Sequence, residues 1–210
     1  TSCMKLKDDD SLLSVIQEDH DTVFLVTNTG YGLSSKTEEI PVVGAKASGV
    51  KAMMLKNDYI VSVNNFDYNK HEFISVLTDK GTGKRVRLNE FELSTRTRRG
   101  VLLLREVKSN PYRVVKTFIE NAKNIIGLKN GEINYIKLTE LPISDRYSTG
   151  ATVNKHGISD AFVVSDLVRI EDIKEQETLV DVEEVEILEE EKEIKKKDKI
   201  SLDEIDDRYL

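Results

Sequence analysis

The sequence predicts an all-β, propeller-like fold built of four-stranded blades. Three observations favour it. Short apolar runs end in a polar pair and a glycine, the runs recur about fifty residues apart, and the residues that follow them partly alternate between polar and apolar. The glycines are Gly30, Gly81 and Gly131. We expect a partial array of about three blades plus an N-terminal part-blade.

The first two strands of each unit are predicted to form a hairpin. The tetrapeptides at 27–30, 78–81 and 128–131 each separate an apolar run from a second strand. A glycine that supplies a positive φ is typical of such tight turns. Residues 84–88 and 133–138 partly alternate polar and apolar side chains, as half-buried strands do.

Two more strands follow in each unit. A second glycine stands nineteen residues after the first, and a third strand is predicted after it; a fourth strand follows a short turn. The predicted third strands are residues 50–55, 101–104 and 151–153, and the fourth are 59–63, 112–115 and 161–164. Glutamates nine residues after each first glycine (Glu39, Glu90 and Glu140) are expected to be structural partners of the blade backbone or of basic side chains.

The chain divides into five predicted segments. Residues 1–20 are expected to end a preceding blade, because residues 6–15 resemble the fourth strand at 55–63; three blades follow at 21–70, 71–123 and 124–173. Residues 174–210 are predicted to form a disordered tail, since residues 171–210 hold 17 acidic and 7 basic side chains.

The body of the chain has the opposite charge balance. Residues 71–120 carry 11 basic and 6 acidic side chains, although the whole chain has a net charge of −7. Several basic residues recur at fixed distances from the repeat glycines, so a curved array would place them on one rim, where they suit a phosphate backbone. The candidate DNA-binding residues are Lys36, Lys46, Lys80, Lys84, Arg85, Arg87, Arg96, Arg98, Arg99, Lys137 and Arg146.

No catalytic or metal-binding constellation is evident in the sequence. The segment from Gly81 to Arg85 resembles a phosphate loop but lacks its leading glycine and its hydroxyl residue, so no nucleotide cofactor is expected. His20 and His71 occupy equivalent places in two units, which indicates a structural role. Cys3 is the only cysteine, and no apolar run is long enough to cross a membrane.

The ordered set of motifs resembles the C-terminal domain of the A subunit of bacterial type IIA topoisomerases, gyrase and topoisomerase IV. In that family a blade reads as an apolar strand, Thr-x-x-Gly, a basic strand, a basic stretch ending in glycine, an apolar strand and a late aspartate. Residues 27–58 and 78–100 match, and the third copy is weaker. The third strands, such as the one at 150–154, depart from the gyrase pattern and favour topoisomerase IV, with gyrase as the close alternative.

The resemblance implies a β-pinwheel, a propeller-like domain that binds and bends double-stranded DNA and presents it for strand passage, decatenation and supercoil relaxation. The cutting chemistry, with its Mg²⁺ and ATP, would belong to other parts of the A subunit, together with the ATPase B subunit, in an A2B2 assembly. The implied location is the bacterial cytoplasm, on the nucleoid, with peripheral association with the cell membrane as a further option. A protein-interaction propeller that does not bind DNA is the alternative, although the chain has no tryptophan.

Overall fold

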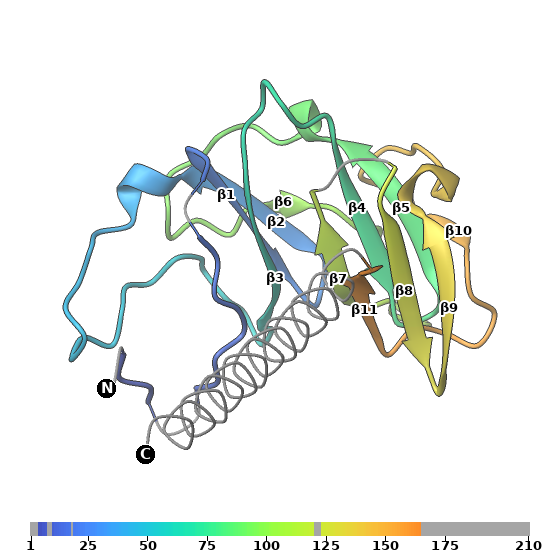
Figure 1. Cartoon of the computed structure of the whole chain (residues 1–210), viewed down its shortest axis with the longest axis horizontal. Coiled ribbons are helices and arrows are strands. Elements are labelled where there is room, and N and C mark those ends of the chain that lie inside the picture. The colour runs from blue at the N-terminus through green and yellow to red at the C-terminus, as the bar shows by residue number, and fades with distance from the viewer. Residues whose placement is uncertain (1–3, 8–9, 18, 120–122, 165–210) are drawn as a thin grey trace, which may run out of the picture. The chain divides into compact units, whose positions relative to one another are not determined.

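The computed structural model describes residues 4–7, 10–17, 19–119 and 123–164. Within these ranges it holds eleven strands in three antiparallel sheets and three short 3-10 helices (Figure 1). The predicted all-β, propeller-like class is confirmed. The end of the third predicted blade, from residue 165, and the predicted disordered tail lie outside the described residues. In the described part of the chain, no helix is long and apolar enough to cross a membrane.

The first sheet has the strand order β3-β1-β2-β6. Its strands are β1 (Thr22–Thr27), β2 (Tyr31–Lys36), β3 (Ile60–Phe66) and β6 (Val101–Leu102). All six residues of β1 are buried, because this strand lies between β2 and β3 in the sheet. Gly30 closes the β1–β2 turn with a φ of 84°, as the sequence predicts.

The second sheet repeats this order as β7-β4-β5-β10. Its strands are β4 (Phe73–Thr78), β5 (Thr82–Arg87), β7 (Val114–Phe118) and β10 (Ala151–Thr152). Because its outer strand β10 is two residues long, most of the sheet is built by the hairpin and β7.

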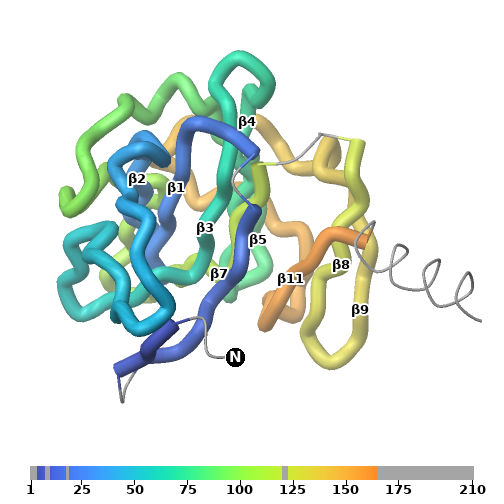
Figure 2. Tube along the Cα trace, turned by 60° about the vertical axis from the view of Figure 1, so that its left-hand side comes forward, coloured from blue at the N-terminus to red at the C-terminus, as the bar shows by residue number. Residues whose placement is uncertain are grey.

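The third sheet has three strands in the order β11-β8-β9. They are β8 (Ile125–Asn130), β9 (Glu132–Lys137) and β11 (Asp160–Val163). Among the described residues no strand pairs with the outer edge of β9, which lies at the margin of its sheet (Figure 2). A 3-10 helix follows the second strand of every hairpin: η1 (Thr37–Glu39), η2 (Leu88–Glu90) and η3 (Leu138–Glu140).

The outermost strand of a sheet comes from the next unit of the repeat. Strand β6 of the second unit pairs with β2 of the first, and β10 of the third unit pairs with β5 of the second. A glycine precedes each exchanged strand. A Cβ on Gly100 would lie 2.1 Å from the carbonyl oxygen of Gly32, and one on Gly150 would lie 2.6 Å from that of Gly83. Only glycine permits such a close approach of two backbones.

Two strand predictions were wrong. Residues 50–55 form no strand, although the equivalent residues of the other two units do. Their partner would be a preceding hairpin, and the described residues before β1 form none. Residues 4–7 and 10–17 likewise contain no strand, whereas the assignment of residues 1–20 to the end of a preceding blade stays a prediction.

The core is continuous from one sheet to the next. Phe24 of the first sheet packs edge-to-face on Phe91, with ring centroids 4.9 Å apart, and both are buried with Ile74 of the second sheet. A second cluster joins Leu77 of the second sheet to Ile126 and other side chains of the third. This shared burial of apolar surface holds neighbouring sheets together. Strands β3, β7 and β11 lie next to one another on the side of the sheets away from the exchanged strands (Figure 1).

Candidate nucleic-acid interface

Arg96 and Arg146, which occupy equivalent places in two units, both bind the backbone of the preceding unit. The Arg96 guanidinium donates to the Lys51 carbonyl oxygen at 2.6 Å, and the Arg146 guanidinium donates to that of Leu102 at 3.2 Å. Lys51 and Leu102 are themselves equivalent, each lying two residues after a repeat glycine. Each arginine therefore joins its own unit to the preceding one, an arrangement that we call the clasp. This role explains why both stand at the same position of the repeat.

The repeated glutamates complete the same clasp. Glu39 accepts a hydrogen bond from the Arg96 backbone N–H at 2.8 Å, and Glu90 accepts one from that of Arg146 at 3.1 Å. The predicted structural role of these two glutamates is confirmed. Glu140 instead accepts from the backbone N–H of Lys137 in its own unit, at 3.0 Å.

Arg99 is anchored by a buried carboxylate. Its two terminal nitrogens lie 2.9 and 2.7 Å from the two carboxylate oxygens of Asp58, whose side chain is fully buried. Burial alone would raise the pKa of Asp58. The hydrogen bonds from Arg99, Thr29 and the Lys56 backbone outweigh burial and hold that pKa well below its usual value. The Arg99 guanidinium also lies 3.9 Å from the centre of the Tyr31 ring.

Lys84 is not on the surface, so its expected place on an exposed rim was wrong. Its side chain is 1% exposed, and its ammonium donates to the carbonyl oxygens of Asp145, Arg146 and Ser148 at 2.9, 3.1 and 2.9 Å. Burial lowers the pKa of Lys84 to about 8. The equivalent residue of the first unit is the buried Leu33, a signal in the sequence that this position faces inward.

Lys36 and Arg87 are paired with acids across their hairpins. The Lys36 ammonium lies 2.5 Å from a carboxylate oxygen of Asp21, and Arg87 pairs with Glu72, which is equivalent to Asp21. The hydrogen bond between Asp21 and Lys36 raises the pKa of Lys36 and lowers that of Asp21. The charges of Lys36 and Arg87 are therefore partly neutralised by these acidic partners.

Arg85 binds the backbone of the third unit. It donates to the carbonyl oxygens of Leu141 at 2.9 Å and Thr139 at 3.3 Å. Its guanidinium also lies 5.3 Å from the centre of the Phe73 ring. Arg85 thus acts beside Arg146 in joining the second unit to the third.

The remaining candidates are more available to a ligand. The side chains of Lys46, Lys80 and Arg98 are exposed and make no hydrogen bond or ion pair with other described residues. Lys137 is also exposed. The sequence pattern did not single out Arg105 or Lys108, which are exposed in the second unit. The excess of basic residues over 71–120 was the signal for them.

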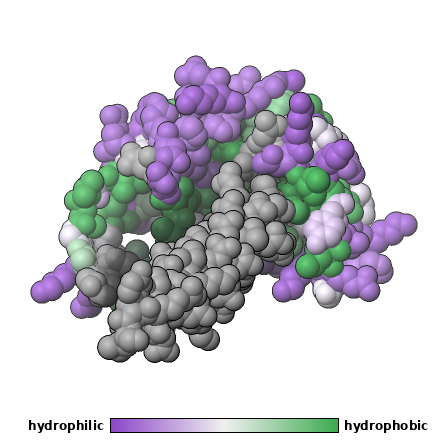
Figure 3. Space-filling view, viewed as in Figure 1, coloured by the Kyte–Doolittle hydropathy of each residue, from purple (hydrophilic) through white to green (hydrophobic). Residues whose placement is uncertain are grey.

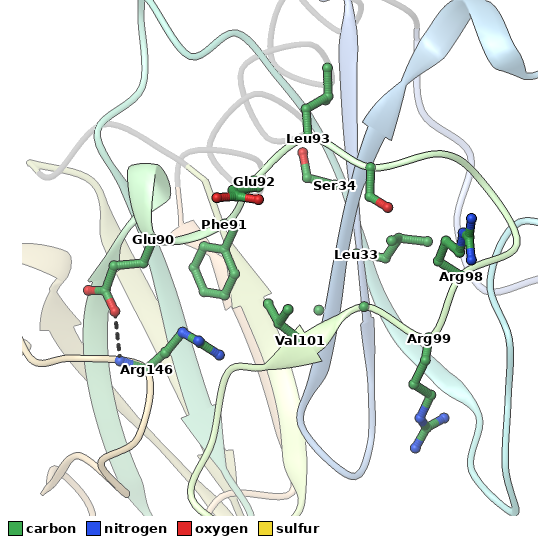
Figure 4. Close-up of a pocket in the computed structure, with 13 residues that line it drawn as sticks. Leu33, Ser34, Glu90, Phe91, Glu92, Leu93, Arg98, Arg99, Val101 and Arg146 are labelled. Atoms are coloured by element: carbon green, nitrogen blue, oxygen red, sulfur yellow. Dashed lines mark hydrogen bonds between the residues drawn. The ribbon is translucent and has the colours of Figure 1, made fainter.

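A hollow of about 520 Å³ lies where the second unit covers the first (Figure 4). Arg98, Arg99 and Arg146 line it together with Glu90 and Glu92. The carboxylate of Glu90 points toward the backbone of Arg146 in this view (Figure 4). Because Asp58 neutralises Arg99, the other two arginines and the two glutamates leave the lining of this hollow close to electrically neutral.

The two histidines of equivalent position meet where the first two units pack. The rings of His20 and His71 lie edge-to-face with centroids 5.2 Å apart. Each is held locally: the backbone of His20 is bonded to Asn65, and the ring of His71 to the Asp67 backbone. No group of three metal-ligating side chains occurs among the described residues.

Comparisons with known proteins agree with this architecture. A family model described as the DNA gyrase C-terminal domain, a β-propeller, matches residues 1–17, 21–67 and 72–118. The A subunit of DNA topoisomerase 4 from Bacillus subtilis (strain 168) is 37% identical over 151 residues, which are 70% of this chain and 19% of that protein. The same subunit of Streptococcus pneumoniae (serotype 4) is 34% identical over 181 residues, 76% of this chain and 22% of that protein. The chain thus spans about a fifth of the length of these relatives.

Solved structures give the same result. The crystal structure of the C-terminal domain of DNA topoisomerase IV is 37% identical, with a TM-score of 0.72 over 77% of this chain and 52% of that chain. The DNA gyrase A C-terminal domain is 15% identical, with a TM-score of 0.66 over 77% of this chain and 57% of that chain, and this likeness shows the fold alone. Because the family model matches more than half of its residues, the chain belongs to the DNA gyrase C-terminal domain family of β-propellers.

Proposed function

We propose that this chain binds and bends double-stranded DNA as an accessory domain of a topoisomerase IV A subunit. One observation carries the proposal: Lys46, Lys80 and Arg98 are exposed and unpaired among the described residues, in a family named for a DNA-handling enzyme. Such side chains attract phosphates through charge and release counterions without reading sequence. Arg105 and Lys108 add exposed positive charge to the second unit, which also holds Lys80 and Arg98.

The clasp arginines have a different part in this proposal. Arg96, Arg99 and Arg146 fix the curvature of the array by joining units, and the free cations contact the DNA that follows the curve. Smooth bending of a 20–30 bp site costs on the order of 1–6 kcal/mol, so several phosphate contacts are needed to offset it. A rigid array makes those contacts at fixed positions.

The parent enzyme is the wider setting of the proposal. The relatives are named as A subunits of topoisomerase 4. We infer that the cutting chemistry, with Mg²⁺ and ATP, lies in other domains and in a partner B subunit of an A2B2 enzyme on the nucleoid. This chain would deliver DNA for decatenation and supercoil relaxation.

A salt titration of duplex binding tests the proposal. We expect affinity to fall steeply with salt, with a slope of about −0.9 for each phosphate neutralised. Lys80→Ala with Arg98→Ala should flatten that slope by about 2, if each contacts one phosphate. The matched control removes two paired cations, with Lys36→Ala and Arg87→Ala, and should change the slope less. Binding that is absent at low salt, or insensitive to salt, would favour a protein-interaction module.

A further inference from the structure

Thr97 holds its backbone in a conformation that threonine rarely adopts. Its φ is 70°, in the left-handed region, where a branched side chain crowds the neighbouring backbone. Among the described residues the other non-glycine residue with a positive φ is Asn57, and asparagine tolerates this region. Strain of this kind persists only where surrounding contacts hold the backbone, and it is most common at functional sites. Thr97 therefore marks a turn whose shape is imposed by its neighbours.

Contacts with the first unit hold the backbone at and after Thr97. The Thr97 N–H donates to the Ala52 carbonyl oxygen at 2.7 Å. One residue later, the Arg98 carbonyl oxygen accepts from the Met54 N–H at 2.9 Å. The exposed side chain of Thr97 makes no hydrogen bond with other described residues. It is thus the backbone of residue 97, and not its hydroxyl group, that has a role in this turn.

The arginines of the turn face in different directions. Arg96 and Arg99 both donate to groups of the first unit. Arg98, which stands between them in the sequence, is exposed and unpaired among the described residues. In Figure 4 the side chains of Arg98 and Arg99 leave the loop in opposite directions. With a left-handed residue at 97, the chain keeps two arginines on the first unit and presents the third to solvent. Figure 3 shows that hydrophilic residues cover much of the visible surface of the chain.

The equivalent loop of the third unit has a different backbone. Tyr147 stands in the place of Thr97, and its φ is not positive. Ser148, in the place of the free arginine, is half-buried, and its carbonyl oxygen accepts from the Lys84 ammonium at 2.9 Å. The counterpart of this lysine in the first unit is Leu33, which offers no such donor to the loop that covers it. The left-handed turn therefore occurs where the loop presents a cation and is absent where the loop turns inward.

We propose that the left-handed turn at Thr97 positions Arg98 to contact a DNA phosphate. This inference rests on the proposed function and adds a positioning residue to it. An arginine on a fixed backbone samples fewer positions than one on a mobile loop, so less conformational entropy is lost when its guanidinium binds. With the backbone form of the third unit, residue 98 would turn toward the first unit, as Ser148 turns toward the second.

A double-variant cycle of duplex affinity tests the link between the two residues. Proline holds φ at about −65°, so Thr97→Pro removes the left-handed turn. We expect it to weaken binding about 5- to 10-fold at about 0.1 M salt and to reduce the salt slope by about 1, the effect of one lost phosphate contact. Arg98→Ala should have the same effect, and combining the two changes should add nothing.

Two results of this cycle would overturn the inference. One is an unchanged affinity in Thr97→Pro with Arg98 in place. The other is a loss from Thr97→Pro that is equally large in the Arg98→Ala background, because the turn would then serve only the packing of the units. Wild-type binding that is absent or insensitive to salt is a separate outcome, since it overturns the proposed function itself and the inference with it.

Tyr147→Pro is the matched control in the third unit. It removes the N–H that donates to the Asp145 carboxylate at 2.8 Å, in a loop whose next residue is no cation. The salt slope of this variant should equal that of the wild type. A slope that falls as far as in Thr97→Pro would overturn the inference, because distortion of either loop, and not the place of Arg98, would then set the affinity.

Thr97→Asn is the conservative variant. Asparagine tolerates a positive φ better than threonine does, so the turn should remain with less strain. We expect a higher urea midpoint than in the wild type and the same salt slope. A flatter slope in this variant would overturn the inference, because the side chain of Thr97 and not the shape of its backbone would then be responsible.

A measurement on the unaltered chain does not require any variant to fold. The backbone ¹⁵N order parameter of Arg98 should be about 0.85, the value of rigid backbone. A value below about 0.6 would reveal a mobile turn that cannot position the arginine, and it would overturn the inference.

Discussion

The loop at 94–99 and the loop at 43–48 stand at the same place in the repeat, yet one is held and the other is exposed. The first is tied to the preceding unit by Arg96 and Arg99 and is followed by a paired strand. The second has backbone bonds from the Lys5 N–H to the Ala47 carbonyl oxygen at 3.3 Å and from the Ala47 N–H to the Gly44 carbonyl oxygen at 2.9 Å, and its Lys46 is exposed. A periodic basic residue is therefore not in itself a sign of DNA contact, because packing between units preserves the same period.

The two glycines that follow these loops give the largest expected difference. Gly100→Ala should destabilise the chain by about 3–4 kcal/mol, because the new Cβ would meet the Gly32 carbonyl oxygen and φ is positive. Gly49→Ala, with the same φ but open space, should cost only about 1 kcal/mol. Urea unfolding of both variants measures the difference. Equal losses would show that backbone strain, and not the exchanged strand, sets the cost.

The Asp58–Arg99 pair comes next. Asp58→Asn should destabilise the chain by about 3 kcal/mol at neutral pH, because it leaves a mostly buried guanidinium without its counter-ion. The pKa of Asp58 is lowered in the folded state, so its contribution is complete above the unfolded value of 3.8 and is lost as pH falls below it. The stability gap between wild type and Asp58→Asn should therefore narrow below about pH 4. A gap that is constant from about pH 6 to about pH 3 would contradict this role.

Lys84 binds the equivalent loop of the third unit, at residues 145–148. Its replacement should reduce stability less than the two largest changes above. Lys84→Met keeps the length of the side chain but removes the ammonium that donates to three carbonyl oxygens at residues 145–148, and the oxygen of Arg146 then has no donor among the described residues. We expect a loss of about 2 kcal/mol and faster amide exchange in that loop. Lys80→Met, at an exposed site, should stay within about 0.5 kcal/mol of wild type. Thermal melts compare the stabilities of the two variants directly. If Lys84→Met were as stable as wild type, water would have to replace the ammonium at these carbonyl oxygens.

The smallest effect on stability is expected for replacement of Arg96. Arg96→Ala should lose about 1 kcal/mol, the value of one hydrogen bond to Lys51, while its backbone bond to Glu39 remains. Lys46→Ala, at the equivalent place in the exposed loop, should leave the free energy of unfolding unchanged. Chemical denaturation of the two variants makes the comparison. If both substitutions cost the same, the two loops do not differ as described.

The sequence was sufficient for the local parts of this fold. Turns at Gly30 and Gly81, with their strands, follow from residues that are neighbours in the chain. The exchange of β6 and β10 could not be predicted in this way, because it depends on pairing between residues about seventy positions apart. The wrong prediction of a strand at 50–55 has the same cause. Its residues are strand-like, but the described residues offer no sheet edge with which they could pair.

The candidate site shows the same division. That basic residues recur was evident, but their roles depend on partners in other units: Asp58 for Arg99, Lys51 for Arg96, and the 145–148 backbone for Lys84. Only the comparison of Lys84 with Leu33 carried a hint of burial. Spacing alone cannot separate a cation that faces solvent from one that faces the next unit.

The central claim is that some basic residues join neighbouring units while others contact DNA. The salt dependence of duplex affinity for two single variants tests this claim most directly. Arg98→Ala should reduce the slope of log affinity against log salt by about 1, with no change in stability. Arg96→Ala should leave the slope unchanged and lower stability. If Arg96→Ala flattened the slope at unchanged stability while Arg98→Ala did nothing, the division between clasp and contact would be contradicted.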